Sequence, residues 1–196
     1  MNVAIVKYNA GNVCSVDYAL RRLGVEARLT ADETELRKAD KVIFPGVGEA
    51  GTTMAYLHAS GLDQVIRSLC QPVLGICLGM QLMCNHSEEG DAQGLGIFDV
   101  DVKRFRPQRH EDKIPHMGWN TLSATRGELF AGFDKEEYVY FVHSYYVPLC
   151  EGTAAVANYI HPFSAALQKD NFYATQFHPE KSGSVGERIL HNFLAL

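Results

Sequence analysis

A cysteine between two glycines is the residue of this chain best placed to act as a nucleophile. Cys77 lies in Gly75-Ile76-Cys77-Leu78-Gly79, where an apolar strand is expected to turn directly into a helix. Such a nucleophile elbow strains the backbone of its central residue and needs small residues on both sides, which Gly75 and Gly79 supply. Cys77 would then lie at a helix N-terminus, where unpaired N–H groups and the helix dipole favour the nucleophilic thiolate.

A nucleophilic cysteine needs a base, and the base needs a group that orients it. His178-Pro179-Glu180 supplies both, and its proline restricts the backbone between them. The motif follows a predicted strand over 173–177, so His178 is expected at the carboxyl end of a strand, the edge where Cys77 leaves its own strand. The sequence therefore predicts an acyl-transfer site built on Cys77, His178 and Glu180.

An acyl-transfer site also needs N–H donors for the oxyanion of its intermediate. The backbone N–H of Leu78, directly after the nucleophile, is one candidate. The second is expected from the glycine-rich loop over 45–51, which follows a strand at the same edge. This loop matches neither the dinucleotide-binding nor the phosphate-loop pattern, so on its own it is also compatible with a simple turn.

The elements that must position these residues alternate between strands and helices in the first half of the chain. Strands are expected over 3–7, 25–29, 42–44 and 72–74, and helices over 13–23, 32–38, 52–70 and 78–84. Continuously apolar strands between helices are typical of an open parallel α/β sheet with both faces covered. The second half predicts short strands over 95–105, 138–147, 153–159, 163–168 and 172–177, then a helix over 184–196. Pro115 to Asn120 is interpreted as a functional loop.

Composition narrows the class of protein. The 196 residues predict a single domain, 1–196, and the net charge of −5 without a basic stripe argues against a nucleic-acid partner and for small molecules or proteins. No apolar run is long enough for a membrane span, and the N-terminus has no basic leader. Five cysteines without paired spacing favour a reducing compartment, with the cytoplasm as the default. The other four cysteines are interpreted as small core or interface residues, and the histidine spacing predicts no metal site.

Three motifs together resemble the class I, or triad, glutamine amidotransferases over essentially the whole chain. They are PGVG at 45–48, GICLGMQ at 75–81 and HPEKS at 178–182. The resemblance implies a three-layer α/β/α fold with a largely parallel sheet, no cofactor, and attack by Cys77 on the side-chain amide of L-glutamine. His178 would accept the thiol proton and then protonate the departing ammonia, Glu180 would orient His178, and water would hydrolyse the glutamyl thioester. The remaining positions implied are the oxyanion donors Leu78 and Val47 and the glutamine-binding residues Gly48, Gln81, Ser144 and Tyr145.

Further segments are similar to one branch of that family, the glutaminase subunits of imidazole glycerol phosphate synthases of histidine biosynthesis. They are residues 9–12, 115–120 and 140–145, with Ala10 standing where a glycine is more usual. The similarity implies a heterodimer with a (β/α)₈ cyclase, which uses the ammonia to form imidazole glycerol phosphate and aminoimidazole carboxamide ribotide. Positions implied near that interface are Asn12, Trp119, Tyr140 and Lys181. A sealed interface has a chemical reason, because free ammonia would be protonated and lost in neutral water.

Three other interpretations stay open at this stage. The chain could serve another acceptor pathway, such as anthranilate, pyridoxal phosphate or purine synthesis, which the co-purifying synthase would reveal. It could be a stand-alone cysteine hydrolase or amidase, although Gln81, Ser144 and Tyr145 argue against that. It could also be a non-catalytic module, although all three triad residues are present. We further expect the loop over 46–48 to turn its oxyanion donor away until the cyclase binds its own substrate.

Overall fold

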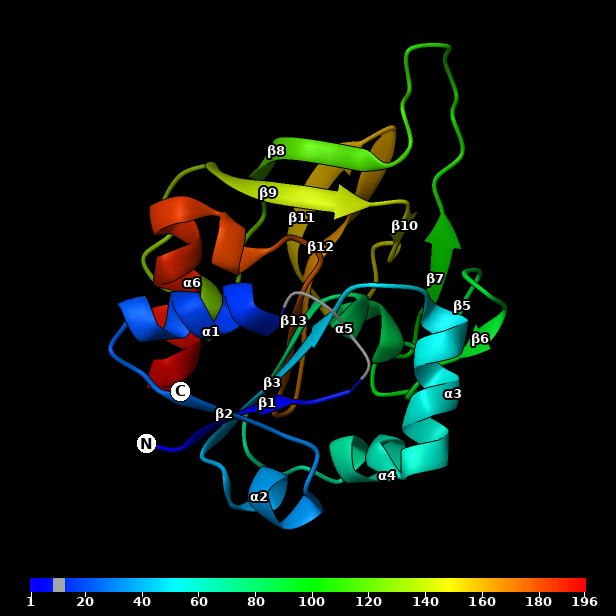
Figure 1. The fold of residues 1–196 in the computed structure, drawn as a ribbon. Coiled ribbons are helices and arrows are strands. Elements are labelled where there is room, and N and C mark those ends of the chain that lie inside the picture. Colours follow the sequence, from blue (N-terminus) through cyan, green and yellow to red (C-terminus); the bar gives the residue numbers. More distant parts are fainter. Residues whose placement is uncertain (9–12) are drawn as a thin grey trace.

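The central sheet has seven strands and carries the elbow in its middle (Figure 1). The computed structural model describes residues 1–8 and 13–196. The strand order is β11 (Thr153–Tyr159), β12 (His161–Lys169), β13 (Phe172–Thr175), β4 (Val73–Cys77), β3 (Lys41–Gly46), β1 (Val3–Val6) and β2 (Ala27–Thr30). The strands from β13 to β2 are parallel, and β12 and β11 continue the sheet antiparallel.

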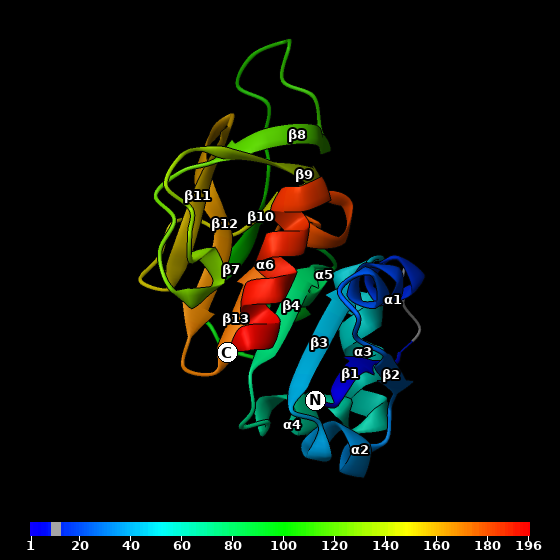
Figure 2. The same cartoon turned by 90° about the vertical axis from the view of Figure 1, so that its left-hand side faces the viewer.

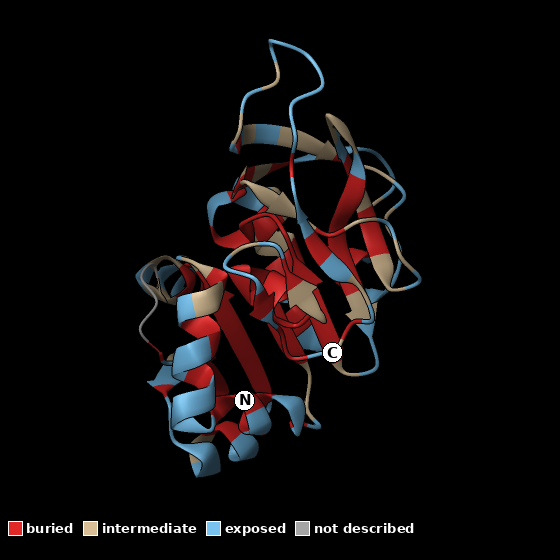
Figure 3. Ribbon diagram, turned by 90° about the vertical axis from the view of Figure 1, so that its right-hand side faces the viewer, coloured by how far each residue is buried: buried red, intermediate tan, exposed pale blue. Residues whose placement is uncertain are grey.

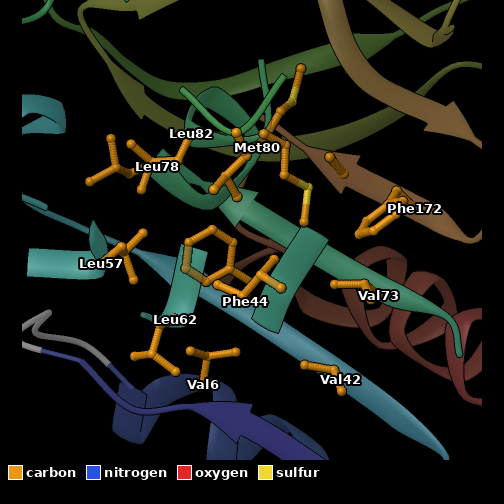
Figure 4. Close-up of a cluster of buried hydrophobic side chains, with 14 of the residues drawn as sticks. Val6, Val42, Phe44, Leu57, Leu62, Val73, Leu78, Met80, Leu82 and Phe172 are labelled. Atoms are coloured by element: carbon orange, nitrogen blue, oxygen red, sulfur yellow. The ribbon is translucent and has the colours of Figure 1, made fainter. Parts of the chain in front are cut away.

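Alternate residues of the central strands pack into two separate hydrophobic cores, one on each face of the sheet. Along β1, Val3 and Ile5 pack into one cluster, whereas Ala4 and Val6 pack into the other. Successive side chains of a strand point to opposite faces, so an apolar run buried on both sides builds two cores. Figure 4 shows the second cluster, in which Phe44 lies among side chains of β3, β4 and the elbow helix.

Helices cover both faces of this sheet (Figure 2). Helices α1 (Val13–Arg22) and α6 (Gly183–Ala195) pack on one face. The other face is covered by α2 (Glu33–Lys38), α3 (Ala50–Ser60), α4 (Leu62–Arg67) and α5 (Leu78–Leu82). Asp32 caps the start of α2 by accepting a hydrogen bond from the Glu35 N–H at 2.9 Å.

Two smaller sheets complete the second half of the chain. One has the order β10 (Tyr145–Tyr146), β7 (Asp101–Arg104), β5 (His86–Ser87) and β6 (Ala92–Gln93). The other is an antiparallel pair of β8 (His116–Leu122) and β9 (Glu137–His143), and the 3-10 helices are η1 (Glu128–Phe130) and η2 (Pro179–Lys181). Figure 3 shows buried residues concentrated in the central strands, with the segment between β7 and β8 projecting outward. This arrangement confirms the predicted fold class: a largely parallel three-layer α/β/α sheet with antiparallel additions.

Several predicted elements need correction. The helix expected over 52–70 is two helices, because Gly61 adopts a left-handed conformation (φ 74°) between α3 and α4. Pro115 to Asn120 is not a loop, since His116 begins the seven-residue strand β8. The strand expected over 95–105 is confined to β7, and that over 138–147 is interrupted at Ser144. Among the described residues, no helix is long and apolar enough to cross a membrane.

Candidate active site

The elbow forms as predicted, and steric contact explains its glycines. Cys77 ends β4 with φ 55° and ψ −109°, a conformation that non-glycine residues rarely adopt, and α5 begins at the next residue. A Cβ atom on Gly79 would lie 2.0 Å from the carbonyl oxygen of Phe44, and one on Gly75 would lie 2.9 Å from the Met83 sulfur. Helix α5 can therefore pack this closely on β3 and β4 only with small residues at these positions.

His178 and Glu180 form a buried pair just beyond β13. The imidazole Nδ1 lies 2.7 Å from the Glu180 carboxylate, and the two residues are 2% and 8% exposed. The carboxylate can only accept at this distance, so Nδ1 carries the hydrogen. Within the part of the chain that the structure describes, His178 Nε2 is buried without a hydrogen-bond partner. Burial by itself lowers the pKa of His178, but neighbouring Cys77 and Glu180 outweigh it and raise that pKa from 6.5 to about 10.

The sulfur of Cys77 has two further polar neighbours. The amide Nε2 of Gln176 lies 3.8 Å from Sγ, and the carbonyl oxygen of Val142 lies 3.9 Å from it. An amide N–H can donate to a thiolate, whereas a carbonyl can only accept from a thiol. Both protonation states of Cys77 therefore find a polar partner in the site.

A cleft of about 330 Å³ opens above the nucleophile. It collects Cys77, His178 and the other predicted site residues Val47, Gly48, Leu78, Gln81, Ser144, Tyr145 and Lys181. Glu180 lies behind His178 and outside the lining. Among the described residues, no three His, Cys, Asp or Glu side chains are grouped as metal ligands.

Gln81 is oriented by two hydrogen bonds from its amide nitrogen. Nε2 donates to the carbonyl oxygen of Tyr145 at 3.0 Å and to Oε1 of Gln176 at 2.9 Å. An amide nitrogen has only two hydrogens, so both are used. Any hydrogen bond from Gln81 to a molecule in the cleft must therefore use its carbonyl oxygen as an acceptor.

The glycine-rich loop lies against the elbow and is held at both ends. A Cβ atom on Gly46 would lie 2.6 Å from the Gly79 nitrogen, and the buried hydroxyl of Tyr8 donates to the carbonyl oxygen of Pro45. At the far end Glu49 caps α3, accepting from the N–H groups of residues 51 and 52. The loop is thus short and tethered, and Gly48 within it adopts a φ of 123°.

Sequence reasoning missed several residues of the site. Glu89 is the only carboxylate that lines the cleft within the described chain, and its Oε2 accepts from the Ala50 N–H at 3.0 Å. Burial and the nearby Glu49 raise the pKa of Glu89. Val142, His143 and Gln176 also lie at the site. Gln176 could have been found from the sequence, because it lies two residues before His178 in the same predicted strand segment. Glu89 belongs to no recognisable motif.

Of the positions implied for a partner interface that the structure describes, Trp119 and Tyr140 lie outside the cleft lining, whereas Lys181 lines the cleft and is exposed. Trp119 of β8 is 56% exposed, and its ring centroid lies 6.0 Å from that of Tyr140 on β9. Met117 and Tyr138 are exposed on the same two strands, and we call these four residues the β8–β9 face. Asn12 lies outside the described residues.

All five cysteines are free thiols. Cys84 is buried in the core as interpreted from the sequence, and Cys150 is partly buried against it. Cys14 and Cys70 are exposed, so they are not core residues, and the interface alternative stays a prediction for these two. Cys77 is the only cysteine at the cleft.

Comparisons with known proteins agree along the whole chain. The family model of glutamine amidotransferase class-I matches residues 5–196. Imidazole glycerol phosphate synthase subunit HisH of Bacteroides thetaiotaomicron is 72% identical over 196 residues, and that of Yersinia pestis is 44% identical over 198, each match covering 100% of both chains.

Solved structures share the fold at low sequence identity. A crystal structure of a glutamine amidotransferase superposes with a TM-score of 0.74 at 22% identity, covering 98% of this chain and 97% of that one. The PurLQS structure from Thermotoga maritima gives 0.71 at 15% identity, covering 99% and 97%. Together with the family model and the full-length relatives, this likeness leads to one conclusion: the chain is an enzyme of the class I glutamine amidotransferase family, within its branch of HisH subunits of imidazole glycerol phosphate synthase.

Proposed function

We propose that this chain hydrolyses L-glutamine to glutamate and ammonia and passes the ammonia to a cyclase subunit in histidine biosynthesis. The observation that carries the proposal is the strained Cys77 beside a buried His178–Glu180 pair at the cleft. In this proposal Cys77, His178 and Glu180 are the catalytic triad of one domain that spans residues 1–196.

The reaction would proceed through a thioester. The Cys77 thiolate attacks the side-chain amide carbon of glutamine, forming a C–S bond and an oxyanion. His178, protonated because its pKa is raised, gives the Nε2 proton to the leaving nitrogen as the C–N bond breaks and ammonia departs. His178 then takes a proton from water, which attacks the thioester and releases glutamate with the thiolate restored. Glu180 holds the Nδ1–H and stabilises the imidazolium.

The oxyanion would be held by backbone N–H groups. Leu78 supplies one, because it follows the nucleophile at the start of α5. Val47 would supply the second from the tethered loop, after the backbone rotation expected near Gly48.

Glutamine would be bound by the polar groups around the cleft, Gly48, Gln81, Ser144 and Tyr145 among them. Its α-ammonium group needs an anionic or carbonyl partner, and Glu89 supplies the carboxylate. The carbonyl oxygen of Gln81 would add a second acceptor, since both hydrogens of its amide nitrogen are used within the protein.

The partner would be a cyclase with a (β/α)₈ barrel that docks on the β8–β9 face. Exposed aromatic side chains beside the cleft suit a protein interface, and Lys181 lies at the cleft rim nearby. Docking there would cover the cleft and keep ammonia from water. A nucleophile that must stay a free thiol also suits the reducing cytoplasm.

The deciding experiment measures glutamate release from glutamine by the purified chain alone, with the cyclase, and with the cyclase plus its nucleotide ligand. Each measurement is repeated with Cys77→Ser and, as a matched control, Cys70→Ser. We expect activity chiefly in the ligand-bound complex, lost in Cys77→Ser and retained in Cys70→Ser. Full activity of the isolated chain would instead indicate a stand-alone amidase, and full activity of Cys77→Ser would refute the mechanism.

A further inference from the structure

The main-chain carbonyl of Tyr145 accepts hydrogen bonds from two buried side chains. Nε2 of Gln81 donates to it at 3.0 Å, and Nδ1 of His143 lies 2.7 Å from it. A carbonyl oxygen has two lone pairs and no hydrogen, so both side chains must present a hydrogen to it. The carbonyl therefore sets the amide orientation of Gln81 and the Nδ1–H tautomer of His143.

One series of hydrogen bonds connects this carbonyl with the nucleophile. The second hydrogen of Gln81 Nε2 goes to Oε1 of Gln176 at 2.9 Å, so the Gln176 amide nitrogen must face the other way. That nitrogen lies 3.8 Å from the sulfur of Cys77. Gln81 and Gln176 are 5% and 0% exposed, so neither has water as an easy alternative partner.

A second series of hydrogen bonds connects the same carbonyl with side chains of β8. With its hydrogen on Nδ1, His143 must accept at Nε2, where Nδ1 of His116 lies 2.9 Å away. His116 then accepts at Nε2 from the Asn120 side-chain nitrogen at 3.3 Å. Asn120 is itself fixed, since its nitrogen also donates to the carbonyl oxygen of Asn158 at 3.0 Å and its oxygen accepts from the Thr121 N–H at 2.8 Å.

The surroundings keep both imidazoles neutral and immobile. The ring of His116 stacks on Tyr159 and Phe141, with centroids 4.1 and 4.8 Å apart. Burial lowers the pKa of His116 to about 4 and that of His143 to about 3. A single direction of donation thus runs from Asn120 through His116 and His143 to the Tyr145 carbonyl at neutral pH.

We propose that Asn120, His116 and His143 are positioning residues, which act through the Tyr145 carbonyl to hold Gln81 and Gln176 against the cleft and the Cys77 sulfur. Asn120 follows Trp119 of the β8–β9 face on the same strand. The position of β8 therefore bears on the orientation of groups in the cleft. The kinetic part of this inference rests on the proposed glutaminase function, whereas the reactivity of Cys77 can be measured without it.

Two variants of His143 separate positioning from bulk packing. His143→Phe keeps an aromatic ring but removes both hydrogen bonds, whereas His143→Asn keeps a donor near the Nδ1 position that can reach the Tyr145 carbonyl. We expect His143→Phe to raise the KM for glutamine in the cyclase complex, and to slow alkylation of Cys77 by iodoacetamide, by roughly three- to tenfold each. His143→Asn should lose less than His143→Phe in both measurements, because the hydrogen bond to the Tyr145 carbonyl is kept while the one from His116 is lost.

The alkylation rate is followed on the Cys77 peptide by mass spectrometry, and circular dichroism confirms that each variant is folded. A folded His143→Phe with native KM and native alkylation rate would overturn the proposal, as would equal losses in both variants. If the native complex releases no glutamate, the proposed function fails, and the alkylation comparison still decides the positioning role.

Nitrogen-detected NMR of the imidazoles in the native chain gives a test that needs no variant. The proposal requires Nδ1–H tautomers at both His116 and His143 between about pH 6 and 8. An Nε2–H tautomer at either residue would break the direction of donation and overturn the proposal, even if both variants failed to fold.

Discussion

At the residue scale, His178 is surrounded by two groups that oppose the effect of its burial. Glu180 and Cys77 both favour the imidazolium form, and the Glu180 contact is a 2.7 Å hydrogen bond between buried groups. In Glu180→Gln the side chain can still accept from Nδ1, but the negative charge is lost. The pKa of His178 should therefore fall, and with it the population of the thiolate–imidazolium pair.

We expect Glu180→Gln to lower glutamate release by the cyclase complex by about 100-fold, within the usual range for general acid–base groups. Alkylation of Cys77 near neutral pH should slow as well. Glu187→Gln is the matched control, since Glu187 pairs with Arg22 on the surface. Native activity in Glu180→Gln would show that the carboxylate charge is not needed.

Glu89 offers a second test at this scale, directed at substrate binding. In Glu89→Gln the side chain can still accept from the Ala50 N–H, but it no longer offers a charge to the α-ammonium of glutamine. We expect the KM for glutamine to rise by about tenfold with a smaller effect on kcat, as for loss of a charge-assisted hydrogen bond. Glu88→Gln, one residue earlier and exposed, should leave KM unchanged. The same change in both variants would place the ammonium group elsewhere.

At the scale of elements, the elbow depends on how closely α5 crosses β3. A Cβ on Gly79 would lie 2.0 Å from the Phe44 carbonyl oxygen, which is backbone and cannot move aside. Gly79→Ala should therefore lower the free energy of unfolding by about 3 kcal/mol, at the upper end for overpacking. Gly24→Ala is the control, because a Cβ there meets nothing within 4 Å and the cost is only that of a φ of +75°, about 1 kcal/mol. Urea unfolding measures both, and equal losses would contradict the steric explanation.

Local patterns predicted the elements around the triad, and long-range pairing determined the rest. The elbow, the His178-Pro179-Glu180 segment and the apolar strands are each encoded within a few neighbouring residues. By contrast, β8 is defined by its pairing with β9, about 20 positions later, and the density of special residues over 115–120 suggested a functional loop. Glu89 follows no motif, and the contact of His116 with His143 forms only when β8 pairs with β9, so neither arrangement could be predicted from neighbouring residues.

At the scale of the whole molecule, two buried histidines make stability depend on pH. The pKa values of His116 and His143 are lowered to about 4 and about 3 in the folded chain, against about 6.5 when unfolded. Below pH 6.5 the unfolded chain therefore binds protons that the folded chain does not, and stability falls with pH down to about pH 4. His178 has its pKa raised to about 10, so its contribution to stability is lost as the pH rises above 6.5 and does not change the slope at lower pH.

We expect the free energy of unfolding to fall by up to about 1.4 kcal/mol per pH unit for each of the two histidines between pH 6 and 4.5. Denaturant unfolding at fixed pH values measures the slope. Replacing His143 by Asn should remove the contribution of one of the two histidines to the slope of unfolding free energy against pH. An unchanged slope in that variant would mean that His143 is not held neutral.

The β8–β9 face is where we expect the cyclase to dock. Trp119 is 56% exposed, so its loss costs the isolated chain little, but an exposed tryptophan beside Tyr140 is well suited to anchor a partner. Trp119→Ala should weaken binding to the cyclase by about 2 kcal/mol, or roughly 30-fold in Kd, and leave the Tm of the isolated chain unchanged. Leu149→Ala, equally exposed at 52% but away from this face, should change neither quantity. Calorimetric titration with the cyclase compares the three proteins, and native affinity in Trp119→Ala would mean that the partner docks elsewhere, so that β8 would no longer connect the partner to the cleft.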